Sequence, residues 1–202
     1  MIRSSPERCG RATRPLGALP GLFVLFLVAW IPSHAQEMAV PVDIQVPILM
    51  KIISFDRNLS ARAGDEIVVG VLYQHGLRAS TLAKEQFLDE AAQLPVIGGL
   101  RIRVVEIRID GEQDLRSVIR GSGARVLYVT PVRSISMGVI TGISRELGIT
   151  TMTGVPEFVN SGIAVGVGLK GERPSIVINL SAAREEGADF SSQLLRLARI
   201  IQ

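Results

Sequence analysis

Residues 66–73 read EIVVGVLY and residues 125–130 read RVLYVT, two continuous apolar runs with turn-forming residues on both sides. Runs of this length without polar alternation are typical of strands that a parallel sheet buries on both faces. Apolar residues at helical spacing predict helices after these runs, over residues 79–93 and 136–147, and Gly148 ends the second helix. This order of strands and helices predicts an α/β domain with a mostly parallel sheet.

Between these runs, residues 100–109 (LRIRVVEIRI) alternate apolar and charged side chains. Such alternation is typical of a half-buried strand, so we expect an edge strand here. The neighbouring pair Val104 and Val105 interrupts the alternation, and a β-bulge at this pair is one explanation.

The C-terminal part predicts strands over residues 163–169 and 175–180, joined by a turn at 170–174 into an antiparallel hairpin. Residues 191–202 place apolar side chains on one stripe and predict a closing helix, which either docks on the core or packs partly against a partner chain. Further helices are expected over residues 43–56, 112–120 and 155–160, a strand over 149–152 and a turn over 58–64. The predicted fold is a single α/β domain over residues 41–202, with a mostly parallel sheet, a C-terminal antiparallel hairpin and a closing helix.

The N-terminus has the organisation of a secretory signal peptide over residues 1–35. A basic stretch precedes an apolar run over residues 16–31 (LGALPGLFVLFLVAWI), and the small residues Ser33 and Ala35 fit a cleavage site after Ala35. The alternative is an uncleaved membrane anchor. A helix over the apolar run would be about 24 Å long, short of the roughly 30 Å hydrocarbon core, so cleavage and export are favoured.

Removal of this leader changes the composition. The chain has 22 Lys and Arg and 19 Asp and Glu residues, of which residues 1–35 hold four and one, so that 18 of each remain. A balanced charge gives no basic surface for nucleic acid, and no nucleic-acid partner is expected. The only cysteine, Cys9, leaves with the leader, which excludes disulfides and cysteine-based metal or catalytic sites in the exported chain.

Two sequence features are better explained by packing or by an exposed loop than by a cofactor site or catalysis. Residues 166–171 match G-x-G-x-x-G, but a strand followed by a turn is the wrong context for a dinucleotide site, and Gly166 and Gly168 rather form a face that another element approaches closely. His75 is the only histidine after residue 35, and no G-x-S-x-G motif surrounds any serine, so no hydrolase is expected. We expect no enzyme activity, cofactor or metal site; acids at 110, 112 and 114 favour a helix start over a calcium site.

A ligand or partner site is predicted where strands 66–73 and 125–130 end. If these strands are neighbours, their carboxyl ends border the crevice in which open α/β sheets bind ligands. Ser134 is expected at a helix start, and Arg133 offers a forked donor, so an anionic small ligand or an acidic partner segment would fit. The alternative is that these are solvated loop ends. The predicted site residues are Tyr73, His75, Arg78, Thr130, Arg133, Ser134 and Ser136.

The last fifty residues carry a family resemblance. Its motifs are Gly154-Val-Pro-Glu-Phe158, Ser161-Gly-Ile163, Ile176-Val-Ile-Asn179-Leu180, Ala182-Ala183-Arg184 and Ser191-Ser192-x-Leu194-Leu195-x-Leu197-Ala198. This pattern resembles the YfiR-like family of exported bacterial regulatory proteins. The resemblance implies a Rossmann-like α/β domain. It also implies a regulatory role, since the best-known member represses a membrane-bound diguanylate cyclase through the periplasmic domain of the cyclase.

Two functions follow as hypotheses. The first is a periplasmic, non-enzymatic regulator or sensor that binds the exported domain of a membrane signalling protein, such as a diguanylate cyclase or a sensor kinase. The second is a periplasmic small-molecule-binding protein that resembles one lobe of a solute-binding protein. A second copy of the chain is a further potential partner.

Overall fold

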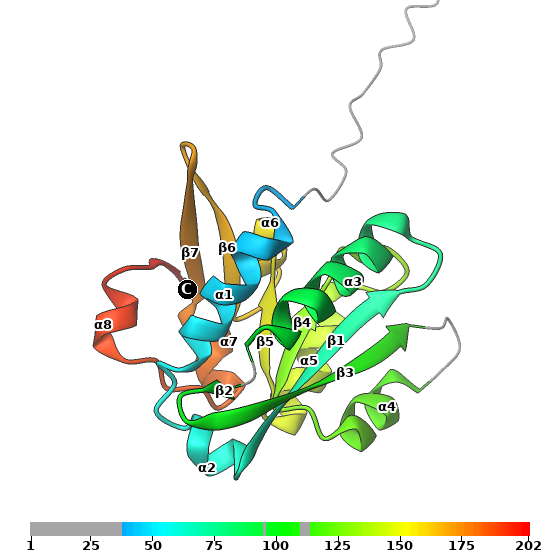
Figure 1. The fold of residues 1–202 in the computed structure, drawn as a ribbon, viewed down its shortest axis with the longest axis horizontal. Helices are drawn as coiled ribbons and strands as arrows, with labels where there is room; N and C mark the ends of the chain where they lie inside the picture. Colours follow the sequence, from blue (N-terminus) through cyan, green and yellow to red (C-terminus); the bar gives the residue numbers. More distant parts are fainter. Residues whose placement is uncertain (1–37, 95, 110–113) are drawn as a thin grey trace, which may run out of the picture. The chain divides into compact units, whose positions relative to one another are not determined.

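The computed structural model describes residues 38–94, 96–109 and 114–202, and the predicted signal peptide lies outside them. In the described part, eight strands form one sheet in the order β2-β3-β1-β4-β5-β6-β7-β8 (Figure 1). The strands are β1 (Glu66–Gln74), β2 (Val96–Ile97), β3 (Leu100–Ile109), β4 (Val126–Val129), β5 (Thr150–Thr153), β6 (Val165–Lys170), β7 (Arg173–Asn179) and β8 (Arg199–Ile201). The helices are α1 (Val42–Ile53), α2 (Leu59–Ala63), α3 (Arg78–Ala92), α4 (Leu115–Ser122), α5 (Met137–Leu147), α6 (Pro156–Asn160), α7 (Leu180–Glu185) and α8 (Ser192–Leu195).

The sheet confirms the predicted α/β class. Strands β3, β1, β4, β5 and β6 are parallel neighbours, and β7 joins β6 as an antiparallel hairpin. The chain runs from β1 to β3 on one side of β1 and then returns to β4 on its other side. The strand order therefore reverses between β1 and β4, which are the two adjacent central strands that the sequence predicted.

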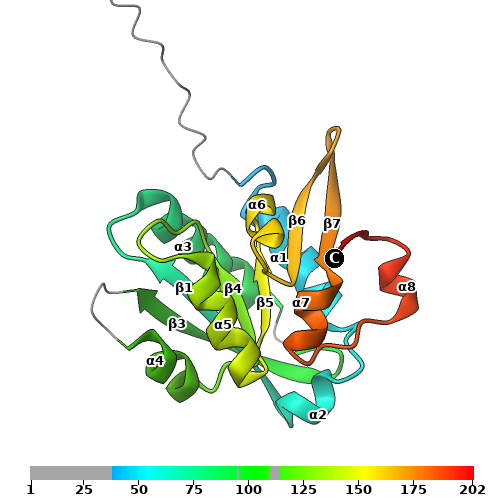
Figure 2. The ribbon, with the colours of Figure 1, turned by 180° about the vertical axis from the view of Figure 1, so that it is seen from behind.

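Helices cover both faces of the sheet and bury a separate apolar cluster on each. Helices α1 and α3 lie on one face, and α4, α5 and α6 lie on the other (Figures 1 and 2). Under α3, the rings of Phe87 and Tyr128 stack with their centroids 4.4 Å apart. Under α4 and α5, Ile119 and Ile140 are fully buried. This two-sided burial explains why β1 and β4 read as continuous apolar runs.

The predicted bulge in β3 is wrong, since β3 pairs with β1 in unbroken register from Arg101 to Ile109. Instead, the two halves of β3 direct their apolar side chains to opposite faces of the sheet. Ile102 and Val104 pack toward the α1 and α3 cluster, whereas Ile107 and Ile109 belong to the cluster under α4 and α5. In the described part of the chain, β3 lies at the edge of the sheet over most of its length, as predicted, because the two-residue strand β2 pairs only with Leu100 and Arg101.

The end of the chain differs most from its prediction. The closing helix is wrong in length, because α8 covers only Ser192–Leu195 and the last residues form β8, a parallel neighbour of β7. Two short helices were missed: α2, where a turn was expected, and α7, which begins after β7. The side chain of Asn179 caps α7 by accepting a hydrogen bond from the Ala182 N–H at 3.0 Å. Helix α4 starts at Leu115, later than predicted. Residues 112 and 113 of the predicted helix lie outside the described residues.

The glycines of β6 admit α6, as the sequence predicted. A Cβ atom on Gly166 would collide with Val159 of α6, and one on Gly168 would lie 3.0 Å from Pro156. Gly154 has a similar role, because a Cβ there would collide with the buried amide of Gln45. These glycines therefore serve packing rather than phosphate binding.

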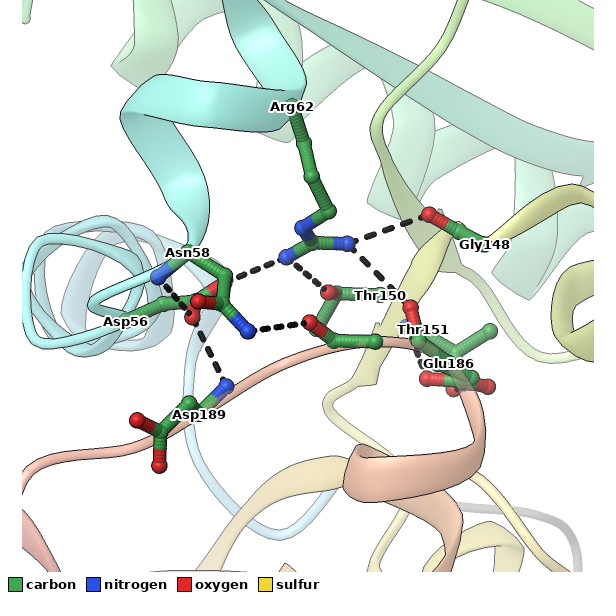
Figure 3. A network of polar contacts seen from close by, with 9 residues as sticks. Asp56, Asn58, Arg62, Gly148, Thr150, Thr151, Glu186 and Asp189 are labelled. Carbon is green, nitrogen blue, oxygen red and sulfur yellow. Dashed lines mark hydrogen bonds and ion pairs between the residues drawn. The ribbon is translucent and has the colours of Figure 1, made fainter.

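A network of polar contacts joins segments that are distant in sequence (Figure 3). The guanidinium of Arg62 donates to the buried carboxylate of Asp56, to Thr150 Oγ1 at 2.9 Å, and to the backbone oxygens of Gly148 at 3.0 Å and Glu186 at 3.2 Å. This side chain thereby ties α2 to the start of β5, the end of α5 and the end of α7.

Glu186 extends the network into the core. Its carboxylate accepts hydrogen bonds from the backbone N–H and the hydroxyl of Thr151, both at 2.8 Å, and contacts Ser144 Oγ at 2.7 Å. Burial raises the pKa of Glu186 to about 7, although the contacts with Thr151 and Ser144 oppose the shift. The uncharged form of Glu186 is therefore favoured by folding.

We expect Leu194→Ala to lower the free energy of unfolding by about 2–5 kcal/mol, since Leu194 is buried and truncation leaves a cavity. Leu197→Ala is the matched control, because this leucine is 70% exposed and should change stability by no more than about 0.5 kcal/mol. Urea denaturation measures both. Equal effects would contradict the burial that the structure assigns to these two residues.

Glu186→Gln should remove a pH dependence of stability. A carboxyl group whose folded pKa is raised binds protons more tightly in the folded state, so stability falls as pH rises from about 4.5 to about 7. Relative to Glu186→Gln, the wild type should lose about 3 kcal/mol over this range. Denaturation at several pH values measures the difference. Glu172→Gln in the exposed hairpin turn controls for the loss of one charge, and a wild-type curve parallel to that of Glu186→Gln would contradict the prediction.

Candidate functional site

The loops at the carboxyl ends of β1 and β4, where the sequence predicted a crevice, are held by a chain of hydrogen bonds. The Thr130 hydroxyl donates to the Leu72 carbonyl at 2.9 Å and lies 2.6 Å from Ser80 Oγ, which in turn accepts from the Gln74 N–H at 2.8 Å. Because Thr130 uses its proton on Leu72, Ser80 donates to Thr130. Both hydroxyls are buried. Thr130 therefore fixes the first turn of α3 to the sheet, with its hydroxyl buried.

The side chain of Gln74 occupies the anion position that the sequence predicted. Gln74 Oε1 accepts hydrogen bonds from the backbone N–H groups of Arg133 at 2.7 Å and Ser134 at 3.0 Å. The helix start is also corrected, because α5 begins at Met137 with Ser136 as its N-cap residue. The two loops adjoin as expected, but the donors between them already have an acceptor from the chain itself.

The other predicted site residues surround this contact without converging on one point. Tyr73 is half-buried, and the Lys84 ammonium lies 5.1 Å from the centre of its ring. His75, Arg78, Arg133, Ser134 and Ser136 are exposed. The crevice as a binding site stays a prediction. A ligand there would bind to the exposed Arg133 guanidinium or displace the Gln74 amide.

The described residues offer no assembled metal centre. No group of three or more His, Cys, Asp or Glu side chains in this part of the chain could hold a metal ion. Within the same residues, no helix has the length and apolar character needed to cross a membrane.

A second candidate site, apart from the predicted crevice, lies along β7 and β8. Two grooves flank these strands. The apolar groove, of about 460 Å³, is lined by residues that include Ile48, Ile52, Phe55, Ile176, Leu194 and Leu197. The basic groove, of about 850 Å³, is lined by residues that include Glu157, Lys170, Ser175, Arg196, Leu197 and Arg199. We call this region, with both grooves, the open edge.

The prediction of a closing helix explains why the sequence analysis did not single out the open edge. A helix over residues 191–202 would place Leu197 beside the other apolar residues of its stripe. In the structure, α8 ends at Leu195, and Leu197 lies in the bend before β8 with its side chain largely exposed. In the sequence, Leu197 stands between Arg196 and Arg199, and these flanking charges are the feature that could have indicated an exposed segment.

Solved structures share this fold at low sequence identity. An ABC domain from Streptococcus pneumoniae in complex with L-Trp has a TM-score of 0.58 at 15% identity, covering 80% of this chain and 62% of that one. A conserved domain protein from Vibrio cholerae has a TM-score of 0.60 at 15% identity, covering 80% and 60%. A ligand-free, open substrate-binding protein with adhesive properties from Clostridium difficile has a TM-score of 0.54 at 17% identity, covering 72% and 57%. This chain thus spans about three fifths of each.

Sequence comparisons give the family. No curated protein matches the chain. The profile of the YfiR/HmsC-like family matches residues 43–199, which include every helix and strand of the structure except the first residue of α1 and the last two residues of β8. The motifs of the last fifty residues, from Gly154 to Ala198, lie inside this match, and they include Gly154 at the Gln45 contact and Asn179 at the cap of α7. The chain belongs to the YfiR/HmsC-like family.

Proposed function

We propose that this chain is a periplasmic, non-enzymatic regulator that binds the exported domain of a membrane signalling protein, such as a diguanylate cyclase or a sensor kinase. Family membership supports a regulatory role. The signal peptide predicted over residues 1–35 supports export. After cleavage, the regulator and the exported domain of its partner would share one compartment.

One observation carries this proposal: Gln74 fills the position where the fold would receive a small anion, while the open edge remains exposed. A ligand in the crevice must compete with two hydrogen bonds that the chain makes to itself. A partner at the open edge meets the exposed Leu197 and two grooves without such competition. Exposed apolar side chains beside grooves favour association with another protein.

The alternative is a small-molecule-binding protein that resembles one lobe of a solute-binding protein. The similarity in fold to a substrate-binding protein from Clostridium difficile favours it. Ligands of two-lobed binding proteins lie between the lobes, and this chain supplies one α/β domain. The alternative therefore predicts a ligand in the crevice rather than a protein at the open edge.

The function is tested by crosslinking in the native host. The full chain with an affinity tag should capture one membrane signalling protein, and membranes that contain this protein should show a changed signalling activity when the purified chain is added. Fractionation of the same cells should find the processed chain in the periplasm, beginning at Gln36. Capture of no membrane signalling protein, or an unchanged activity of the captured one, would contradict the proposal.

The crevice has its own test with two variants of opposite effect. If it binds a carboxylate or phosphate ligand, Arg133→Ala should weaken binding by about 1.5–3 kcal/mol, the range for a hydrogen bond to a charged group. Gln74→Ala should strengthen the same binding, because it frees the N–H groups of Arg133 and Ser134. Calorimetry with citrate and phosphate measures both, and melting temperatures control for folding. Identical binding by the wild type and both variants would exclude the crevice.

A further inference from the structure

One edge of β7 lacks a strand neighbour over more than half of its length. Strand β6 pairs with all of β7 from Arg173 to Asn179, whereas β8 pairs only with Val177–Asn179. In the described part of the chain, the edge beside Arg173–Ile176 has no strand neighbour. Asn179 N–H bonds toward β6, and bonding alternates along an antiparallel pair, so the N–H of Ile176 points to the open side. Pro174 has no N–H, which limits pairing of this edge with itself.

The side chains of β7 lead to different grooves on the two faces of the sheet. Ile176 lines the apolar groove, on the face that α1 covers, and Ser175 lines the basic groove, on the face that α6 covers. Successive residues of any strand point to opposite faces. A strand added beside β7 would therefore place every other side chain in the apolar groove and the remaining ones in the basic groove.

The charges of the basic groove determine which side chains fit there. Lys170, Arg196 and Arg199 line it, and Glu157 is the one acidic residue of its lining. The three basic side chains are exposed, and none of them forms an ion pair with another described residue. Such a groove attracts carboxylates.

We propose that the open edge binds an extended segment of the partner protein in which acidic and apolar residues alternate. The segment pairs with β7 through the Ile176 N–H, its acidic side chains meet Lys170, Arg196 and Arg199, and its apolar side chains enter the groove beside Leu194 and Leu197. This inference rests on the proposed function and specifies the chemistry of the partner.

Synthetic peptides test the pattern directly. A fluorescent peptide of alternating Glu and Val should bind to the chain purified from the periplasm, and its affinity should fall as salt rises. A peptide of alternating Lys and Val should bind at least about tenfold more weakly, as should a peptide with four Glu followed by four Val. Hydrogen exchange of the Ile176 amide should slow when the Glu-Val peptide is bound.

Surface variants locate the site. Arg196→Glu combined with Arg199→Glu should weaken binding of the Glu-Val peptide by about tenfold or more, and Leu197→Asp should weaken it as well. Matched controls are Arg101→Glu combined with Arg184→Glu, and Val139→Asp, because these residues are exposed elsewhere. The controls should bind as the wild type does. No binding of the Glu-Val peptide, equal binding of the Lys-Val peptide, equal effects of variants and controls, or unchanged exchange at Ile176 would each overturn the inference.

Crosslinking in cells separates this inference from the proposed function. Capture of the membrane partner by the wild type but not by Leu197→Asp supports both. Capture by both proteins supports the function and overturns the open edge as its site. Failure of the wild type to capture a membrane signalling protein overturns the function itself.

Discussion

The ion pair between Arg62 and Asp56 is the contact on which the arrangement of the sheet depends. Asp56 also accepts hydrogen bonds from the backbone N–H groups of Asn58 and Asp189, so one carboxylate orders two segments more than 130 residues apart. A buried charge that loses its partner is costly, which favours the arrangement that satisfies both groups. The pair thereby holds α2 against the start of β5 and the end of α7, and Glu186 continues the connection into β5 through Thr151.

Residues of the family motifs near the C-terminus make packing and helix-capping contacts. Gly154 leaves room for the amide of Gln45, whose Oε1 accepts a hydrogen bond from the buried Tyr128 hydroxyl at 3.2 Å. Gly166 leaves room for α6, and Asn179 starts α7. These residues set how closely helices approach the sheet. They carry the family likeness through packing and helix capping.

The two candidate sites differ in whether their polar groups have partners within the chain. At the carboxyl ends of β1 and β4, Gln74 and the Ser80–Thr130 hydroxyl chain satisfy the polar groups. Along β7, the Ile176 N–H and three basic side chains have no protein partner in the part of the chain that the structure describes. Unsatisfied backbone beside exposed apolar surface favours an external strand. The polar groups of one region are satisfied within the chain, and those of the other have no partner among the described residues.

Local pattern alone determined the parallel core of this protein. The sequence alone was enough to predict β1 and β4, the helices that follow them and the role of the glycines of β6. Burial on two faces requires apolar residues along a whole strand, and the close approach of a helix requires glycine. The meeting of the two loops after β1 and β4 followed from the same argument. The unbroken register of β3, the short α8 and the strand β8 could not be read, because each depends on which helix covers a face or which strand lies alongside. Leu197 shows the difference: its spacing fits a helix stripe, but only the pairing of Arg199–Ile201 with β7 places it at an exposed bend.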